Sequence, residues 1–310
     1  MAPRGLGTRG DFIKRILDGD RMKTIRRTNV VYEMSARNAP AAEAAPGETV
    51  RFFTEDAYSG TLRTVRDSRR ASKARGPNPA TGPLFVTGAK PGDVLAVEII
   101  SVRPVGRATM FTGPGKGPLG WKLARDEIAR PRVGRGFVFV DKRRIPAEPM
   151  VGVIGVAPRG KGIPNSLPGE HGGNMDCNVV KAGSTVYLPV AVEGALLALG
   201  DVHAVQAAGE VAVCAAETRG EVTVRIGITR RPMVTPSVET KGDVFIVASA
   251  KSLDRAEAAV LEKAYRYLNE TRGMGPHETV RLMSLACDME ICQVVDPLKT
   301  LRVRIPKRYL

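Results

Sequence analysis

The sequence predicts a mainly β protein, with a β-sandwich or barrel-like body and a small C-terminal α/β element. Three observations favour this class. Glycine and proline are abundant, at 33 and 22 among 310 residues, which is typical of many turns between short strands. Runs rich in β-branched and aromatic residues recur along most of the chain. Long runs of apolar residues at helical spacing appear after about Lys241.

Turn signals and apolar runs place the strands of the body. Pro46-Gly47-Glu48 predicts a turn into a strand at 49–54, and Pro91-Gly92-Asp93 predicts another before a strand at 94–100. The other expected strands are 30–34, 137–140, 151–156, 186–189, 211–215 and 222–228.

The C-terminal part carries a different pattern. A strand is expected at 243–248. Ser252 is a candidate N-cap for a helix through Leu268, and a second helix is expected at 278–286. Closing strands are expected at 292–295 and 301–305. We therefore divide the chain into a basic N-terminal extension at 1–28, with a short amphipathic helix near 12–17, a β-rich body at 29–240 and an α/β subdomain at 241–310.

The composition limits the classes of partner. A net charge of +15 favours anionic partners, and arginines gather in the segment 63–75. Aromatic residues are only 5% of the chain, which leaves little material for stacking bases, so nucleic acid is not the expected partner. A solvated loop explains the arginines better. No apolar run is long enough to span a membrane.

The four cysteines contain no C-x-x-C pair, and no apolar stretch that resembles a secretion signal is present near the start. A cytoplasmic protein with buried thiols is therefore expected. Residues 115–120 match G-x-G-x-x-G, but Pro118 does not open a helix and no βαβ unit surrounds the match. We interpret it as a glycine-rich loop that could line a pocket.

Two clusters carry the candidate chemistry. Residues 168–177 read P-G-E-H-G-G-N-M-D-C, and residues 200–210 read G-D-V-H-A-V-Q-A-A-G-E. Each places a histidine, His171 or His203, next to glycines and near carboxylates. Glycine permits positive φ and a close approach to a ligand. Imidazole beside carboxylate suits a metal site or general acid–base catalysis, although a histidine near carboxylates is also a common structural hydrogen-bonding residue.

The spacing of the second cluster favours a metal. In a strand, Asp201 and His203 point to the same face. The whole ligand set suits Zn²⁺, and the carboxylates alone could hold Ca²⁺. Cys177 with His171 as its base is the rival nucleophile. We expect Cys177 to be a buried thiol instead, since neighbouring carboxylates should raise its pKa.

Both clusters resemble the central motifs of the acetamidase/formamidase family. The similarity extends to Asn78–Pro83 with Pro91–Leu95, to Pro149–Pro158 and to Gln293–Pro297, and it covers about Asn29 to Pro306. The resemblance implies a β-rich fold, hydrolysis of a short-chain amide to a carboxylic acid and ammonia, a bound divalent metal, and a cytoplasmic homo-oligomer. Two departures are notable: no histidine lies near Asn29, and Ala207 replaces the family's glycine.

The motifs and the resemblance together predict one site. The metal ligands are His203 and Asp201, with Asp56 added from the resemblance alone. Either Glu210 or Asp176 is the general base for a metal-activated water, and His171 is a further catalytic residue. The substrate-binding residues expected are Asn174, Gln206 and the backbone of Gly172 and Gly173, whose N–H groups could hold the oxyanion.

The expected substrate is a small neutral amide, because the motifs describe the site and the net charge describes the whole surface. Two alternatives stay open at this stage. One is a basic ligand- or nucleic-acid-binding protein that keeps the fold without amide turnover. The other is a hydrolase of another C–N bond, such as that of a larger or anionic amide.

Overall fold

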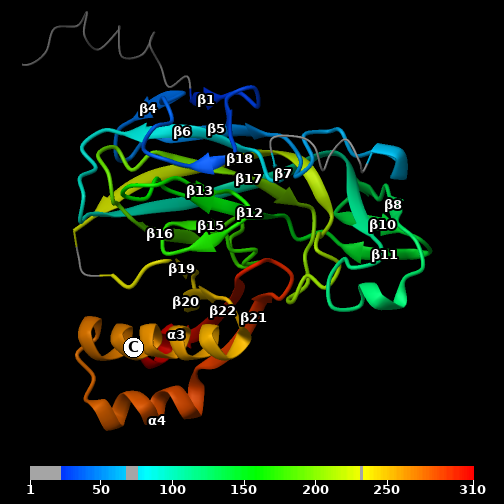
Figure 1. The fold of residues 1–310 in the computed structure, drawn as a ribbon. Coiled ribbons are helices and arrows are strands. Elements are labelled where there is room, and N and C mark those ends of the chain that lie inside the picture. Colours follow the sequence, from blue (N-terminus) through cyan, green and yellow to red (C-terminus); the bar gives the residue numbers. More distant parts are fainter. Residues whose placement is uncertain (1–21, 68–75, 231–232) are drawn as a thin grey trace, which may run out of the picture.

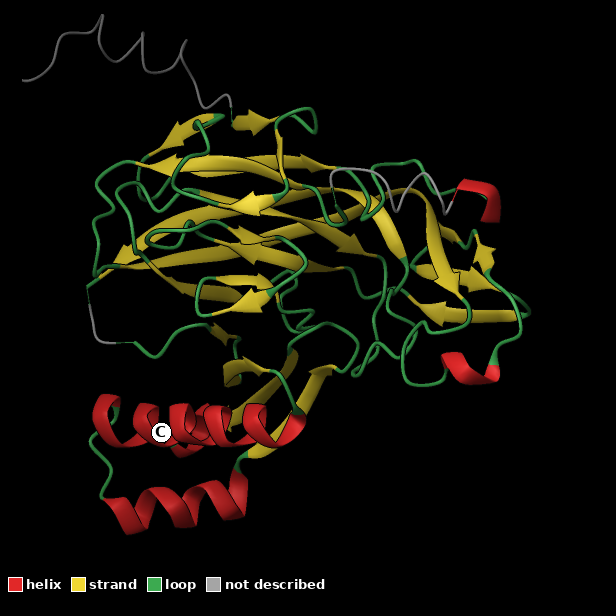
Figure 2. Ribbon diagram, in the orientation of Figure 1, coloured by secondary structure: helices red, strands yellow, loops and turns green. Residues whose placement is uncertain are grey.

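The structure is a computed structural model that describes residues 22–67, 76–230 and 233–310. Curved strands form most of it, and a small helical layer lies at one end (Figures 1 and 2). The predicted fold class is confirmed. The helix expected near 12–17 and most of the arginine-rich segment 63–75 lie outside the described residues.

The first sheet is built around two long strands. β7 (Val94–Thr112) and β18 (Glu217–Thr229) pair antiparallel along most of their length. β5 (Thr49–Thr54) and β16 (Thr185–Pro189) flank this pair, and β1 (Lys23–Ile25) adds a parallel strand beyond β5. Regular pairing therefore begins at Lys23, within the expected N-terminal extension.

The second sheet runs from β6 (Ala80–Val86) through β17 (Leu197–His203) to β12 (Met150–Gly155). β2 (Val30–Val31) and β4 (Ala42–Ala44) lie beyond β6, and β15 (Gly172–Asn174) and β14 (Pro168–Gly169) lie beyond β12. The inner faces of both sheets share one core, whose fully buried members include Phe52, Leu95 and Val224 from the first sheet and Leu84, Ile154 and Leu199 from the second. This packing is that of a β-sandwich.

The two sheets are also joined by hydrogen-bonded pairing at one corner. β17, from the second sheet, pairs with the start of β18, from the first sheet, through Val202↔Thr218 and His203↔Glu217. A candidate imidazole thus lies directly opposite a carboxylate that begins the neighbouring strand.

Smaller elements surround this corner. β8 (Glu127–Ala129) pairs with the far end of β7. β9 (Arg132–Gly134) also pairs with β7 and begins a meander that continues through β10 (Phe137–Val140) and β11 (Arg143–Pro146). β3 (Glu33–Met34) pairs with β13 (Ile163–Pro164). Two 3₁₀ turns, η1 (Val65–Asp67) and η2 (Gly120–Lys122), lie in the loops.

The C-terminal element extends the first sheet. β19 (Ser237–Glu239) pairs with β16, and β20 (Asp243–Ala250), β22 (Lys299–Pro306) and β21 (Asp288–Gln293) follow in that spatial order. α3 (Leu253–Arg266), the π-helical turn η3 (Tyr267–Thr271) and α4 (Pro276–Ala286) pack with β20 and β22 around a separate apolar core. A final turn, η4, covers Lys307–Tyr309.

The expected Ser252 cap is present, since its side chain accepts a hydrogen bond from the backbone N–H of Arg255. The domain boundary at 240/241 stays a prediction, because hydrogen-bonded strands continue across it. Within the described ranges, no helix is long and apolar enough to cross a membrane.

Three strand predictions needed correction. The segment 211–215 is a turn region, because Glu210 and Val213 take positive φ, at 46° and 66°. The expected strand at 30–34 divides into β2 and β3, which have different partners. The strand expected at 292–295 ends at Gln293 as part of β21.

Candidate active site

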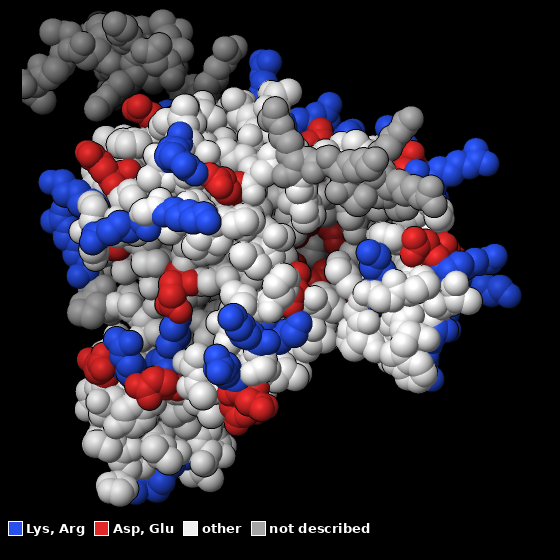
Figure 3. Space-filling model, viewed as in Figure 1, with Lys and Arg blue, Asp and Glu red and all other residues white. Residues whose placement is uncertain are grey.

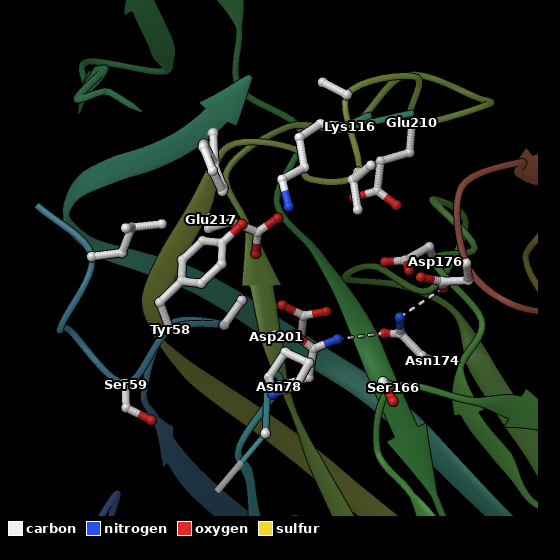
Figure 4. A pocket seen from close by; sticks show the side chains of 18 of the residues that line it. Tyr58, Ser59, Asn78, Lys116, Ser166, Asn174, Asp176, Asp201, Glu210 and Glu217 are labelled. Carbon is white, nitrogen blue, oxygen red and sulfur yellow. Dashed lines mark hydrogen bonds between the residues drawn. The ribbon is translucent and has the colours of Figure 1, made fainter. Parts of the chain in front are cut away.

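A cavity of about 470 Å³ opens at the corner where the two sheets join. Figure 3 shows this side of the molecule hollowed, with acidic atoms in the hollow. The polar and charged residues that line it are Tyr58, Ser59, Asn78, Lys116, Asp126, Ser166, Asn174, Asp176, Asp201, Glu210, Glu217 and Asp296 (Figure 4).

His203 lies at the centre of an acidic cluster. Its Nε2 atom is 3.0 Å from Oε2 of Glu217, 3.4 Å from Oδ1 of Asp201 and 3.9 Å from Oδ1 of Asp176. Glu210 is also buried and forms a second group with His203 and Asp176. This arrangement confirms that the two sequence clusters come together through Asp176 and His203.

Local backbone geometry places the carboxylates. Asp176, Asp201 and Glu210 all have positive φ, at 45°, 57° and 46°, which turns their side chains away from regular strand directions. Gly152 of β12 lies opposite Asp201 across the sheet. A Cβ on Gly152 would come within 2.6 Å of Oδ1 of Asp176 and 2.9 Å of Oδ2 of Asp201. Glycine at this position therefore leaves the space that the carboxylates occupy.

Gln206 fixes the tautomer of His203. The Nε2 atom of Gln206 donates to the carbonyl oxygen of Asp176 at 2.8 Å, so its Oε1 faces Nδ1 of His203, also at 2.8 Å. An amide oxygen can only accept, so Nδ1 carries the proton. In the neutral imidazole, Nε2 then presents its lone pair to the carboxylates. Gln206 was expected to bind substrate, and in the structure it orients the imidazole.

The cluster fits a divalent cation. Four buried atoms that face one another have no hydrogen-bond partner among the described residues: Nε2 of His203, Oδ1 of Asp176, Oδ1 of Asp201 and Oε2 of Glu217. Lone pairs at this spacing repel one another unless a proton or a cation lies between them. Imidazole nitrogen with carboxylate oxygens is a donor set that Zn²⁺ accepts.

Electrostatics support the same conclusion. Burial raises the pKa of Asp201 to about 7, with a further contribution from the charge of Glu217. Burial likewise raises the pKa of Asp296 to about 7, and it raises those of Asp176 and Glu210. Burial alone would lower the pKa of His203, but the nearby Glu217 and Asp201 outweigh it and raise the pKa. Bound positive charge would relieve this repulsion.

Other predicted site residues lie elsewhere. His171 is buried in the β14–β15 turn and does not line the cavity, and neither ring nitrogen has a hydrogen-bond partner in the described part of the chain. Gly172 and Gly173 pack tightly against the carbonyl oxygens of Ile154 and Leu167, outside the cavity lining. Asp56 accepts backbone N–H groups of Tyr58 and Gly60, both at 2.9 Å, and so stabilises the turn that carries Tyr58.

Several cavity residues were missed in the sequence. Glu217 follows an apolar run and belongs to no motif. Its register opposite His203 becomes visible only once β17 and β18 pair. Asp296 lies in the segment 293–297 that resembled the family, and Lys116 lies in the glycine-rich loop. A sequence feature therefore marked the segment of each residue, although neither residue was predicted to belong to the site. Tyr58 had none.

Asn174, an expected substrate contact, does line the cavity. Its Nδ2 atom donates to Oδ2 of Asp296 at 2.7 Å, and its Oδ1 atom accepts from Nδ2 of Asn78 at 3.2 Å (Figure 4). This chain of hydrogen bonds holds Asn78 and Asp296 at the cavity wall.

The environment of Cys177 differs from the expectation. Its pKa is lowered to about 6, chiefly by a hydrogen bond with Cys292 and, against the effect of burial, by the guanidinium of Arg302, whose Nη1 lies 3.6 Å from Sγ. The expected rise from neighbouring carboxylates was therefore wrong. The thiol is nevertheless completely buried and does not line the cavity.

Comparison with known proteins identifies the family. The profile of the acetamidase/formamidase family matches residues 156–252. The crystal structure of an acetamidase from Bacillus halodurans is 36% identical in sequence, with a TM-score of 0.89, over 92% of this chain and 98% of that one. The chain belongs to the acetamidase/formamidase family. The family profile covers the Gly172–Gly173 turn, Asp176, His203 and Glu217.

Two curated relatives match this chain over only part of their length. A protein of Schizosaccharomyces pombe described as a formamidase is 28% identical over 62% of this chain and 62% of its own length. The acetamidase of Mycolicibacterium smegmatis is 27% identical over 64% and 66%. The chain therefore spans less than two thirds of these relatives.

One of the two differences from the family motifs causes no backbone strain. Ala207, which stands where the family's glycine was expected, is exposed and does not have positive φ. A Cβ is therefore accommodated there without backbone strain.

The buried His171 predicts a measurable pH dependence of stability. Burial lowers its pKa to about 4 from an ordinary 6.5, so the unfolded chain binds the extra proton first. The contribution of the neutral His171 ring to the free energy of unfolding is complete above pH 6.5 and is lost as the pH falls toward 4. The total loss is on the order of 3 kcal/mol. In the His171→Leu variant the fall in unfolding free energy between pH 6.5 and 4 should be smaller by about this amount.

Urea unfolding at several pH values measures the difference. The exposed His277 provides the matched control, and His277→Leu should keep the wild-type pH slope. Parallel curves for wild type and His171→Leu would show that His171 finds a compensating partner.

The close approach of two carboxylates to Gly152 predicts that a side chain at this position would weaken cation binding. Gly152→Ala should displace the carboxylates of Asp176 and Asp201 and weaken binding of a divalent cation, with Zn²⁺ as the probe, by about 10- to 100-fold, while the fold is retained. Competition with a chelating dye measures the affinity. Gly227→Ala in β18 is the control, because its Cβ would find an ordinary 3.4 Å contact with Ala96. Equal zinc affinity in both variants would place the cation elsewhere.

Proposed function

We propose that this chain hydrolyses short-chain aliphatic amides to the carboxylic acid and ammonia. The observation that carries the proposal is the buried group of His203, Asp176, Asp201 and Glu217 beside the cavity, whose ligand atoms have no hydrogen-bond partner within the described ranges. Membership of a family that includes named acetamidases and formamidases supports the same reaction.

The residues that would hold the cation are His203, Asp201 and Glu217, whose atoms lie nearest to one another. We propose Zn²⁺, because the set includes an imidazole nitrogen, with Ca²⁺ as the alternative if carboxylates dominate. Such a cation, when bound, supplies the Lewis acidity that activates water near neutral pH.

Glu210 is the proposed general base. It lines the cavity, and burial raises its pKa, which makes its carboxylate a stronger base. Asp176 is less free for this role, because its Oδ1 atom faces Nε2 of His203 within the proposed cation cluster. Glu210 accepts a proton from water as the water oxygen bonds to the amide carbon. It returns that proton to nitrogen as the C–N bond breaks, and ammonia leaves.

Neutral donors at the wall orient the amide. The pKa of Tyr58 is raised well above its usual value, first by burial and then by the charges of neighbouring Cys214 and Glu217, so its hydroxyl keeps its proton. A protonated hydroxyl in the cavity can donate to the carbonyl oxygen as negative charge develops there. We assign this task to Tyr58 in place of the Gly172–Gly173 backbone, which lies outside the cavity lining.

Two finer proposals concern the setting of the enzyme. We propose a homo-oligomer, supported by the exposed apolar residues Val280 and Leu285 on α4. A cytoplasmic location is proposed because the four cysteines are free thiols, as expected in a reducing compartment.

The alternative of a nucleic-acid-binding protein gains no support from the cavity. Its carboxylates would repel phosphates, and the described basic residues are spread over the visible surface (Figure 3). Residues 68–75 of the arginine-rich segment lie outside the described part of the chain.

The function is tested by replacing the central imidazole. His203→Ala should reduce ammonia release from formamide and acetamide by about 10³-fold or more, because the variant loses the nitrogen ligand of the cation. Zinc content should fall with activity while circular dichroism stays native. The control is His277→Ala on α4. A His203→Ala enzyme with wild-type turnover and zinc content would contradict the assignment.

A thiol nucleophile is tested separately. Cys177→Ser should retain activity within about an order of magnitude, because the side chain is completely buried and a substrate cannot reach it. Steady-state ammonia release and mass spectrometry of the protein incubated with substrate provide the measurements. Complete loss of activity, together with an acyl adduct on wild-type Cys177, would replace the water mechanism with a covalent one.

A further inference from the structure

The cavity is much larger than the simplest amides require. Its volume of about 470 Å³ lies in the range of pockets that take ligands of tens of atoms. Formamide and acetamide would fill only a small part of it. The remaining space is available to a longer acyl chain or to a second polar group of the substrate.

The lining is chemically divided. The acidic group and His203 form one part, described above. Another part is apolar and includes Ala57, Leu62, Phe111 and Val213. Methylene groups of a substrate would be desolvated against such a wall, which favours an aliphatic chain.

One cation also lines the cavity. Lys116 extends from the loop between β7 and η2, and its ammonium points into the cavity on the side of Glu210 and Glu217 (Figure 4). Its Nζ lies 5.0 Å from the ring centroid of Phe111. Among the described residues, Lys116 has no carboxylate within 4.0 Å and forms no ion pair, although this cavity is rich in acids.

The loop that carries Lys116 is closely fitted to the site. A Cβ on Gly117 would overlap the carbonyl oxygen of Val211, next to Glu210, and a Cβ on Gly113 would overlap the carboxylate of Asp126. These glycines belong to or adjoin the glycine-rich stretch 115–120, whose match to a nucleotide-binding pattern was rejected because no βαβ unit surrounds it. Its glycines instead bring Lys116 against the Glu210 turn.

We propose that Lys116 binds a carboxylate at the far end of the substrate's acyl chain, so that monoamides of short dicarboxylic acids are preferred substrates. This inference rests on the proposed amide hydrolysis. A half-buried ammonium pairs with a carboxylate through charge-assisted hydrogen bonds, and the apolar wall accepts the intervening methylenes. The substrate class differs from the small neutral amide expected from the sequence.

The experiment compares succinamate with pentanamide, an uncharged amide of similar length. Wild type should prefer succinamate in kcat/KM by about tenfold or more. Lys116→Met removes the charge and keeps the side-chain length. It should lower kcat/KM for succinamate by about 10- to 100-fold and change that for pentanamide by less than about threefold.

Lys122→Met provides the matched control. Lys122 lies in the same region, is exposed, and has its Nζ 4.3 Å from the ring centroid of Trp121, outside the cavity. The Lys122→Met substitution removes the same charge from the surface, so this variant should behave as wild type with both substrates at low and high salt. Equal losses of succinamate turnover in both variants would assign the preference to long-range steering and overturn the proposal.

Two further results would also overturn it. A wild-type enzyme without preference for succinamate would show that Lys116 does not select substrates. Equal losses on succinamate and pentanamide in Lys116→Met would place the ammonium at the reacting atoms.

If no amide is hydrolysed, the proposed function fails, and calorimetry tests the subsite alone. Binding of succinate that is tighter than that of pentanoate and lost in Lys116→Met supports the subsite. Equal binding in wild type and variant overturns it.

Discussion

The pairing of β17 with β18 is the contact on which the site depends. It joins the two sheets at one corner and sets His203 opposite Glu217. The imidazole and carboxylate atoms end 3.0 Å apart, although each residue belongs to a different layer of the sandwich. Because both layers share one close-packed core, the corner cannot shift without disturbing that core. The fold therefore fixes the site's central distance before any ligand binds.

The cost of this geometry is a concentration of negative charge in a buried space. Asp176, Asp201 and Glu210 combine raised pKa values with positive φ. Three residues with both properties in one place indicate strain that the surrounding structure maintains. Gly152 leaves the carboxylates room, and Gln206 sets the tautomer of His203. Both features suit a cation site and neither residue belongs to the apolar core cluster, which is the physical reason to regard the cluster as functional.

The sequence predicted what local patterns determine. Strand alternation, turn residues and the Ser252 cap gave the fold class and most elements. The two-residue spacing of Asp201 and His203 predicted that both share a site, and their ligand atoms lie 3.4 Å apart, although the positive φ of Asp201 departs from regular strand geometry. Glu217 could not be found this way, since its place depends on register between two sheets. His171 shows the opposite problem: its glycines and carboxylates gave the same local signal as His203, and only tertiary packing separates a buried ring from a cavity residue.

The net charge of +15 and the acidic cavity act over different distances. Surface lysines and arginines raise the concentration of all small anions near the protein, and salt screens that effect within about 10 Å. Such a field cannot distinguish one anion from another. Discrimination requires a charge that is held at a fixed distance from the reacting group and is sheltered from solvent. Among the described residues, Lys116 is the cation that lines this cavity, and the absence of side chains at Gly117 and Gly113 lets its loop pack against the Glu210 turn. Global charge thus determines how often anions arrive, while this single ammonium determines which of them fit.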